Sequence, residues 1–240
     1  MKRSQPRHRL IMGKNCLQEL LEFAPEQILQ VYTSKDQDPL IDEIENRGIL
    51  IKRVKKDHLS DMAGSDSHQS FIAEVKDKQF LNLQTYLEKE ENRLVLMLDS
   101  INDPQNFGTL LRAAECFGVD AVVWSKNRGV DLTPVVSKAS VGASELMPML
   151  RVSNLVDTIK KFQEAGFWVV TAEVGEETQS LHSFEFPEKT LLVMGSEGKG
   201  VQPLISKNAD FKIFIPMMGK IDSLNVSQAT SVILSHWRKR

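Results

Sequence analysis

Short, uninterrupted apolar runs in the second part of the chain are the feature that most constrains its fold. They are LVLML (94–98), AVVW (121–124), FWVVT (167–171), TLLVM (190–194) and FKIFIP (211–216). A strand that is apolar throughout is buried on both faces, which is typical of a parallel sheet covered by helices on both sides. Helical stretches separate the runs, so the sequence predicts an α/β fold with a parallel sheet.

The stretches between the runs carry helix signals. A helix is expected over about 106–117, because its apolar residues recur at helical spacing and Gly118 follows as a stop. A second is expected over 154–165, before Gly166. The last helix places Val226, Ala229, Val232, Ile233 and Trp237 on one stripe. Ser223 stands where its N-cap is expected.

The first 75 residues form a separate α/β pattern. It comprises helices over 15–23 and 39–47, and strands over 28–33, 49–54 and 70–75. The following segment, 76–92, is polar and charge-rich, which suits a connector with one helical segment. We therefore expect a small module over residues 1–75, a linker over 76–92 and a larger domain over 93–240.

Composition excludes several classes of protein. The 240 residues are 41% hydrophobic and 26% charged, as in a globular protein with a real core. No apolar run approaches the roughly 18 residues of a membrane span, and the N-terminus resembles no signal peptide, so a cytoplasmic location is expected. Two distant cysteines, Cys16 and Cys116, and five scattered histidines predict neither a disulfide framework nor a metal site. Both thiols are expected to be buried.

The net charge of −2 hides three basic clusters. They comprise Lys2, Arg3, Arg7, Arg9 and Lys14; Lys52, Arg53, Lys55 and Lys56; and Arg238, Lys239 and Arg240. Clustered cations neutralise phosphates, which indicates an RNA partner. A solvated surface with a frayed tail is the alternative for any single cluster.

Polar and glycine-rich segments follow three of the predicted strands. They are DSINDPQNFG (99–108), GSEGKG (195–200) and MMGKIDSLN (217–225). In an open parallel sheet, ligands bind beyond the carboxyl ends of the strands, so these loops predict a site. GSEGKG matches neither the dinucleotide-binding G-x-G-x-x-G nor a phosphate-binding P-loop, and no G-x-S-x-G elbow of a serine hydrolase occurs.

A few polar side chains near these strand ends are candidates for chemistry: Asn106, Arg112, Glu197, Ser223 and Asn225. Each alone has a plainer explanation as a helix cap, a solvated charge or a loop carboxylate. Their occurrence together at three strand ends favours a functional site.

Three motifs in these loops resemble those of the SpoU (TrmH) branch of the SPOUT RNA ribose 2'-O-methyltransferases. The motifs are N-x-G-x-x-x-R (Asn106, Gly108, Arg112), G-x-E-x-x-G (Gly195, Glu197, Gly200) and S-L-N-V-S (Ser223 to Ser227). The resemblance covers about residues 93–240. Its specificity lies in the order and spacing of all three.

The resemblance implies a trefoil-knotted α/β domain that holds S-adenosylmethionine (SAM) in the knot. It also implies a homodimer with the active site near the subunit interface. In the family the cofactor is held largely by main-chain groups, which correspond here to Gly195, Ile215 and Leu224, with Met194, Gly200 and Met217 as neighbours. Main-chain recognition explains why the sequence carries no side-chain fingerprint for a cofactor.

The resemblance also implies roles for the polar side chains. Arg112 is the family's candidate for activating the ribose hydroxyl. Because arginine is a poor base, orientation and phosphate binding are at least as plausible a role for Arg112 as proton abstraction. Asn225 and Ser223 would position the ribose and the loop around SAM. Asn106 would hold the first motif's turn or the RNA, and Glu197 would brace the loops.

Residues 1–75 resemble the ribosomal-protein-L30-type RNA-binding module of the 23S rRNA guanosine 2'-O-methyltransferases. SHQSFIAEV (67–75) carries this likeness, whereas LIMGKNCLQELL departs from the family pattern at Met12 and Asn15. A guanosine of 23S rRNA is therefore the expected target. Alternatives are a tRNA or another rRNA site, a non-catalytic RNA-binding protein on the same fold, and a nucleotide-dependent enzyme with an atypical α/β site.

Overall fold

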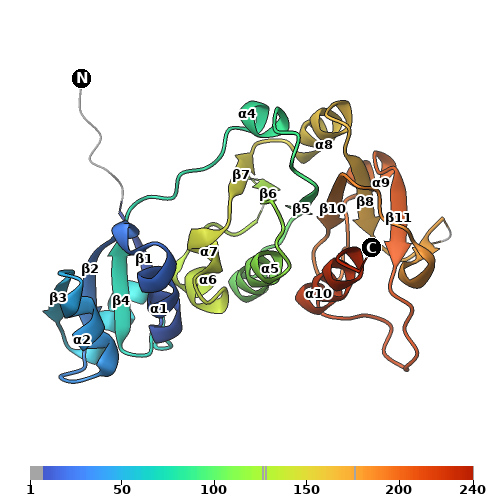
Figure 1. Ribbon diagram of the computed structural model, residues 1–240. Coiled ribbons are helices and arrows are strands. Elements are labelled where there is room, and N and C mark those ends of the chain that lie inside the picture. The colour runs from blue at the N-terminus through green and yellow to red at the C-terminus, as the bar shows by residue number, and fades with distance from the viewer. Residues whose placement is uncertain (1–7, 126, 128, 176, 240) are drawn as a thin grey trace. The chain divides into compact units, whose positions relative to one another are not determined.

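The computed structural model, which describes residues 8–125, 127, 129–175 and 177–239, divides into two compact units (Figure 1). Unit 1 comprises Met1–Gln79 and Leu132–Leu146, and unit 2 comprises Phe80–Asp131 and Met147–Arg240. Residues 132–146, which the sequence-based boundaries assign to the larger domain, thus group with the N-terminal residues. The linker segment contains the expected helix, α4 (Leu83–Leu87).

Unit 2 is built on a parallel sheet with the strand order β7-β6-β5-β10-β8-β11-β9. The five apolar runs form five of its seven strands, which confirms the predicted α/β class. The strands are β5 (Leu94–Leu98), β6 (Ala121–Ser125), β7 (Met149–Val152), β8 (Trp168–Ala172), β9 (Gln179–Ser180), β10 (Thr190–Met194) and β11 (Phe211–Phe214). Sequence reasoning missed β7 and β9. The knot that the resemblance implies stays a prediction.

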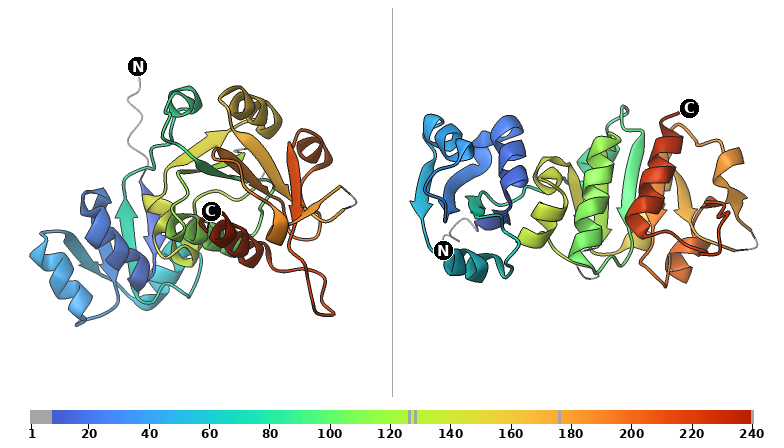
Figure 2. Two further views of the ribbon diagram at one scale, coloured as in Figure 1. Left: turned by 45° about the vertical axis from the view of Figure 1, so that its right-hand side comes forward. Right: turned by 90° about the horizontal axis from the view of Figure 1, so that it is seen from below.

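Helices cover both faces of this sheet. Buried side chains of α4, α8 (Leu155–Glu164) and α9 (Pro203–Lys207) share one core cluster with the strands. The helices α5 (Pro104–Cys116) and α10 (Val226–Trp237) pack side by side (Figure 2). This arrangement leaves the carboxyl ends of the strands for the loops that connect strands to helices.

The cap of α10 differs from the prediction. The helix begins at Val226, and the Asn225 side chain caps it by accepting a hydrogen bond from the Ser227 backbone N–H at 2.9 Å. Ser223 lies too far ahead of the first turn to reach that group, and its hydroxyl donates instead to the Asp222 carboxylate at 3.1 Å. Asn106 is not a cap either, because Asp103 caps α5 and Pro104 occupies the first helical position.

Unit 1 contains a four-stranded mixed sheet in the order β1-β4-β2-β3. Only β2 and β3 are parallel. The elements are β1 (Arg9–Met12), β2 (Ile28–Thr33), β3 (Leu50–Arg53), β4 (Phe71–Val75), α1 (Lys14–Phe23), α2 (Pro39–Asn46), α3 (Lys56–Ala63), α6 (Pro134–Ala139) and α7 (Ala143–Leu146). Two short 3₁₀ helices, Pro25–Gln27 in unit 1 and Leu181–Ser183 in unit 2, complete the set.

A buried ion pair joins β1 to α7 inside unit 1. The Arg9 guanidinium donates two hydrogen bonds to the Glu145 carboxylate, which is fully buried. The Lys78 ammonium donates to the Glu145 backbone carbonyl at 2.6 Å. Residues 132–146 are therefore held in unit 1 by buried electrostatic contacts as well as by apolar packing.

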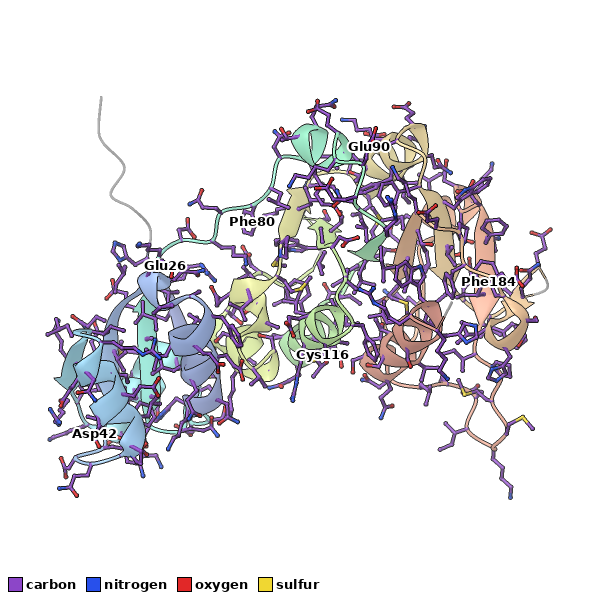
Figure 3. The ribbon with its side chains drawn as sticks, viewed as in Figure 1. Glu26, Asp42, Phe80, Glu90, Cys116 and Phe184 are labelled. Carbon is purple, nitrogen blue, oxygen red and sulfur yellow. The ribbon has the colours of Figure 1, made fainter. Side chains whose placement is uncertain are left out.

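The two cysteines differ in exposure. Cys16 is buried, as expected, but Cys116 is exposed at the end of α5, so that part of the prediction was wrong (Figure 3). The apolar stripe of α5 runs through Phe107, Leu110, Leu111 and Ala114, and Cys116 falls off it. Among the described residues, no helix is both long and apolar enough to cross a membrane.

The three basic clusters differ in how many of their cations are free to bind RNA phosphates. Lys2, Arg3, Arg7 and Arg240 lie outside the described residues. Arg9 is committed to Glu145, and Lys14 bonds Asp38 at 2.7 Å. Arg238 donates to the Phe117 carbonyl at 2.6 Å. The cluster Lys52, Arg53, Lys55 and Lys56 is exposed on unit 1, where Arg53 lies 3.6 Å from the Glu45 carboxylate. Lys55 and Lys56 have no ion pair within the described residues, so they can face a phosphate backbone.

Candidate active site

A cavity of about 820 Å³ opens at the carboxyl ends of β8, β10 and β11 in unit 2. It is lined by the end of β8, by the end of β10 with the glycine-rich loop 195–201, by the segment 213–226 from β11 to α10, and by Ala229 and Ile233 of α10. Its volume lies within the ~300–1,000 Å³ that is common for small-molecule sites. The cavity is therefore large enough for a cofactor of nucleoside size.

The glycine-rich loop folds back on itself at the cavity. Ser196 and Gly200 exchange two backbone hydrogen bonds of 3.1 and 2.9 Å. A Cβ on Gly195 would lie 2.1 Å from the Gly200 carbonyl carbon and 2.2 Å from the Val201 nitrogen. Only glycine fits at 195, and the close approach brings peptide groups to the cavity wall.

The structure brings the predicted cofactor residues together. Each of them lines this one cavity: Met194, Gly195, Gly200, Ile215, Met217 and Leu224. They come from three segments of the sequence, and the wall they form is mainly apolar side chain and main chain. Such a wall fits a nucleoside cofactor that is recognised by backbone groups, in line with the absence of a side-chain motif.

Three of the predicted polar residues meet through one side chain. The Asn225 Nδ2 donates to Asn106 Oδ1 at 2.9 Å and also to the Glu197 carboxylate. Its Oδ1 accepts from the Ser227 backbone N–H and hydroxyl. Glu197, Ser223 and Asn225 line the cavity, whereas Asn106 reaches it through Asn225. The three motifs are thus physically joined.

Arg112 lies apart from this group. It projects from the exposed side of α5 and does not line the cavity. Its guanidinium forms no hydrogen bond or ion pair with any residue in the described part of the chain. A guanidinium in this state retains all its donors for an external acceptor such as a phosphate.

Sequence reasoning missed a set of hydrogen bonds, here called the Asp99 clasp, between the first and second motif loops. The Asp99 carboxylate, fully buried after β5, accepts the Gln202 backbone N–H at 2.8 Å and the Gln202 side-chain amide. Ser100 also donates to Asp99, at 2.9 Å. The signal that could have revealed it is a carboxylate directly after a buried strand. The clasp fixes the start of the first loop against the end of the second.

The match to a family of known sequences decides the assignment. The profile described as the SpoU rRNA Methylase family matches residues 93–235, more than half of the chain. The chain belongs to this family. A second profile, described as RNA 2'-O ribose methyltransferase substrate binding, matches residues 10–81.

Relatives within the SpoU family match along nearly the whole chain. The 23S rRNA (guanosine-2'-O-)-methyltransferase RlmB of Photobacterium profundum is 38% identical over 233 residues, covering 94% of this chain and 95% of that protein. The Escherichia coli protein of the same name is 35% identical over 233 residues, covering 94% and 96%.

Solved structures show the same fold. The SpoU methyltransferase AviRb of Streptomyces viridochromogenes, in complex with the cofactor AdoMet, superposes with a TM-score of 0.80 at 20% identity, covering 97% of this chain and 89% of that one. The A. aeolicus TrmH/SpoU tRNA modifying enzyme gives a TM-score of 0.56 at 29% identity, covering 65% and 79%. The SpoU fold that the resemblance implied is therefore confirmed.

Proposed function

We propose that this chain is a SAM-dependent RNA ribose 2'-O-methyltransferase that acts on a guanosine of 23S rRNA. The observation that carries the proposal is that the second and third motif loops line one cavity, where Asn225 bonds both Glu197 of the second motif and Asn106 of the first. The guanosine and 23S rRNA assignment draws its support from the RlmB relatives, whose names specify that substrate.

SAM fits the cavity by its size and by the apolar side chains and main-chain groups that line it. When bound, it supplies a methyl group on a sulfonium, a good leaving group for in-line displacement by the ribose oxygen. We assign its binding to Met194, Gly195, Gly200, Ile215, Met217 and Leu224, which line the cavity. The backbone groups at Gly195 and Gly200 are held rigidly by the closed loop, so they are preorganised for a ligand.

Arg112 is assigned to the RNA. Its exposed guanidinium suits a bidentate bond to the phosphate next to the target ribose, which would align the hydroxyl with the methyl group. A guanidinium is a poor proton acceptor, so we give Arg112 orientation as its main role. Asn106, Glu197, Ser223 and Asn225 would hold the loops and the ribose in register.

A homodimer is also part of the proposal. The segment between β11 and α10 extends from the sheet (Figure 1) and exposes large apolar side chains at its tip, with Met218 96% and Ile221 78% exposed. Val232 on α10 is exposed as well. Apolar surface of this kind is commonly covered by a partner. Sedimentation of the purified protein would test this, and a monomer at working concentration would contradict it.

Residues 1–75 are proposed as the RNA-binding module, 76–92 as a linker and 93–240 as the methyltransferase domain of a cytoplasmic protein. The support for the RNA role is the exposed cluster Lys52, Arg53, Lys55 and Lys56. A Lys55→Ala, Lys56→Ala double variant is expected to weaken RNA binding and to flatten its salt dependence, with SAM affinity unchanged. An unaltered salt slope would argue against an RNA role for this cluster.

The deciding experiment offers labelled SAM with 23S rRNA that lacks 2'-O-methyl groups and, separately, with tRNA. We expect label to enter 23S rRNA at one guanosine, which primer extension or mass spectrometry would locate. Label in tRNA alone would reassign the substrate while keeping the reaction. No transfer to either RNA, together with no SAM binding in calorimetry, would overturn the function.

A further inference from the structure

We infer that the Glu173 carboxylate binds the ribose hydroxyls of SAM. The inference rests on the proposed SAM-dependent function and adds a residue outside the three motifs. Glu173 follows the last residue of β8 and lines the same cavity as Gly195 and Leu224. Nothing in the motif pattern marks it, because it lies on a strand end that carries no glycine-rich or S-L-N-V-S segment.

The position of Glu173 follows from the sheet order. β8 and β10 are neighbouring parallel strands, paired in register through Thr171 and Val193. Their carboxyl ends therefore reach the same edge of the sheet. The glycine-rich loop leaves β10 there, and Glu173 leaves β8 there. Glu173 and the close-packed peptide groups of the glycine-rich loop therefore line the same cavity.

The carboxylate is fixed in orientation. Its Oε1 accepts the Thr171 hydroxyl at 2.6 Å, and Ser206 from α9 donates within 2.9 Å of both carboxylate oxygens. The Glu173 backbone N–H donates a hydrogen bond to the Ile213 carbonyl at 2.9 Å. The two hydroxyls leave acceptor sites on the carboxylate, which has about four lone-pair positions. The half-buried side chain can therefore receive further donors from the cavity.

The chemistry of such a group points to a ribose. In dinucleotide-binding sheets, a glycine-rich turn follows one strand and an acidic residue on a nearby strand end hydrogen-bonds the ribose 2'-hydroxyl. Here the acidic residue precedes the glycine-rich loop in sequence, so a motif search fails, but the spatial relationship is the same. An ionised carboxylate accepts only, and the vicinal hydroxyls of SAM are neighbouring donors.

The test compares wild type with Glu173→Gln by calorimetry. The ligands are SAM, S-adenosylhomocysteine and the 2',3'-dideoxyribose analogue of S-adenosylhomocysteine. We expect Glu173→Gln to bind SAM and S-adenosylhomocysteine about 10- to 100-fold more weakly, as for loss of a hydrogen bond to a charged group. Wild type should strongly prefer S-adenosylhomocysteine over its dideoxy analogue, and Glu173→Gln should lose most of that preference.

Two further variants separate this role from general effects. Glu177→Gln removes an exposed carboxylate of the same segment, whose nearest cation is Lys212 at 3.9 Å, and is expected to bind SAM as wild type does. Ser206→Ala keeps the Glu173 carboxylate but removes the hydroxyl that donates a hydrogen bond to it. SAM binding should weaken by about 5-fold, which corresponds to the loss of one ordinary hydrogen bond. The Ser206 variant remains informative if Glu173→Gln fails to fold.

Several results would overturn the inference. One is a SAM affinity of Glu173→Gln within twofold of wild type, and another is an equal loss of SAM affinity in Glu177→Gln. A third is that both wild type and Glu173→Gln lose the same affinity when S-adenosylhomocysteine is replaced by its dideoxy analogue. The fourth is an unchanged SAM affinity of Ser206→Ala. A wild-type protein with no affinity for SAM would instead remove the proposed function itself, so the two failures are distinguishable.

Discussion

Asn225 donates its side-chain amide to the side-chain oxygen of Asn106 at 2.9 Å, across 119 positions of sequence. The same amide donates to Glu197, and its oxygen caps α10. Each polar atom of this side chain therefore has a different task. The order of the three motifs around the cavity depends on it.

Asn225→Asp separates these tasks. Aspartate caps a helix as well as asparagine does, so α10 should keep its start. The new oxygen, however, faces Glu197 and cannot donate to Asn106, so the loops should shift apart. We expect methyl transfer to fall about 100-fold, as for a displacement of about 1 Å at a reacting centre. Rates measured under saturating SAM and RNA would show it.

Asn154→Asp is the matched control. Asn154 caps α8 through Val156 and Asp157, and its amide donates to the Asp157 carboxylate at 2.7 Å. The substitution therefore makes the same chemical change on another helix of unit 2. Activity close to wild type is expected. An equal loss in both variants would show that helix-cap disturbance, not the loop junction, controls the rate.

Arg112→Ala should impair the reaction and spare cofactor binding. The side chain does not line the cavity, so the SAM dissociation constant is expected to stay within twofold of wild type. Turnover should fall by at least about 100-fold through lost alignment of the hydroxyl. Lys160→Ala removes an exposed cation from α8 and serves as the control. Near-normal turnover of Arg112→Ala would remove this residue from the mechanism.

Glu145→Ala should destabilise unit 1. Arg9 would keep its charge, with only 17% of its side chain exposed, and lose its buried partner, so that only the half-exposed Asp77 at 3.5 Å remains. Breaking a buried pair in this way typically costs about 3–5 kcal/mol in the free energy of unfolding. The exposed i,i+4 pair of Glu43 and Arg47 provides a control, for which Glu43→Ala should cost less than about 1 kcal/mol. Urea unfolding of the two variants would distinguish these costs.

Lys78 should make unit 1 more stable at alkaline pH. Burial is the main cause that lowers the pKa of Lys78 from 10.5 to about 8 in the folded chain. Between about pH 8 and 10.5 the unfolded chain binds the proton that the folded chain has released, so the free energy of unfolding rises with pH. Lys78→Met should flatten this rise, whereas Lys76→Met, on an exposed side chain, should not. Identical curves for wild type and Lys78→Met would contradict the assignment.

Apolar runs predicted most strands of unit 2, because strands such as β5 and β10 consist almost entirely of buried apolar residues. This pattern missed β7, which has four residues and includes Arg151, and β9, which has only two residues, both polar. The grouping of residues 132–146 with unit 1 also escaped prediction, because Glu145 meets Arg9 only after the chain has folded.

The sequence was sufficient to predict which strand ends form the candidate site, but not which side chains hydrogen-bond to one another there. The loops near 100, 196 and 220 could be chosen from their polar content alone. The bonds from Asn225 to Asn106 and Glu197 depend on side-chain directions that sequence spacing does not encode. Ser223 was predicted as the cap because serine is a preferred N-cap residue shortly before an apolar helical stripe, whereas the helix begins only after Asn225.

The closed turn at Gly195 limits how this protein could escape an inhibitor. A compound that replaces the cofactor would meet peptide groups there, and no side chain can be introduced to repel it, because a Cβ would lie 2.2 Å from the Gly200 carbonyl oxygen. Resistance would have to arise at side chains elsewhere around the cavity. Inhibitors that bind the backbone of residues 195–200 would therefore be the least open to resistance mutations.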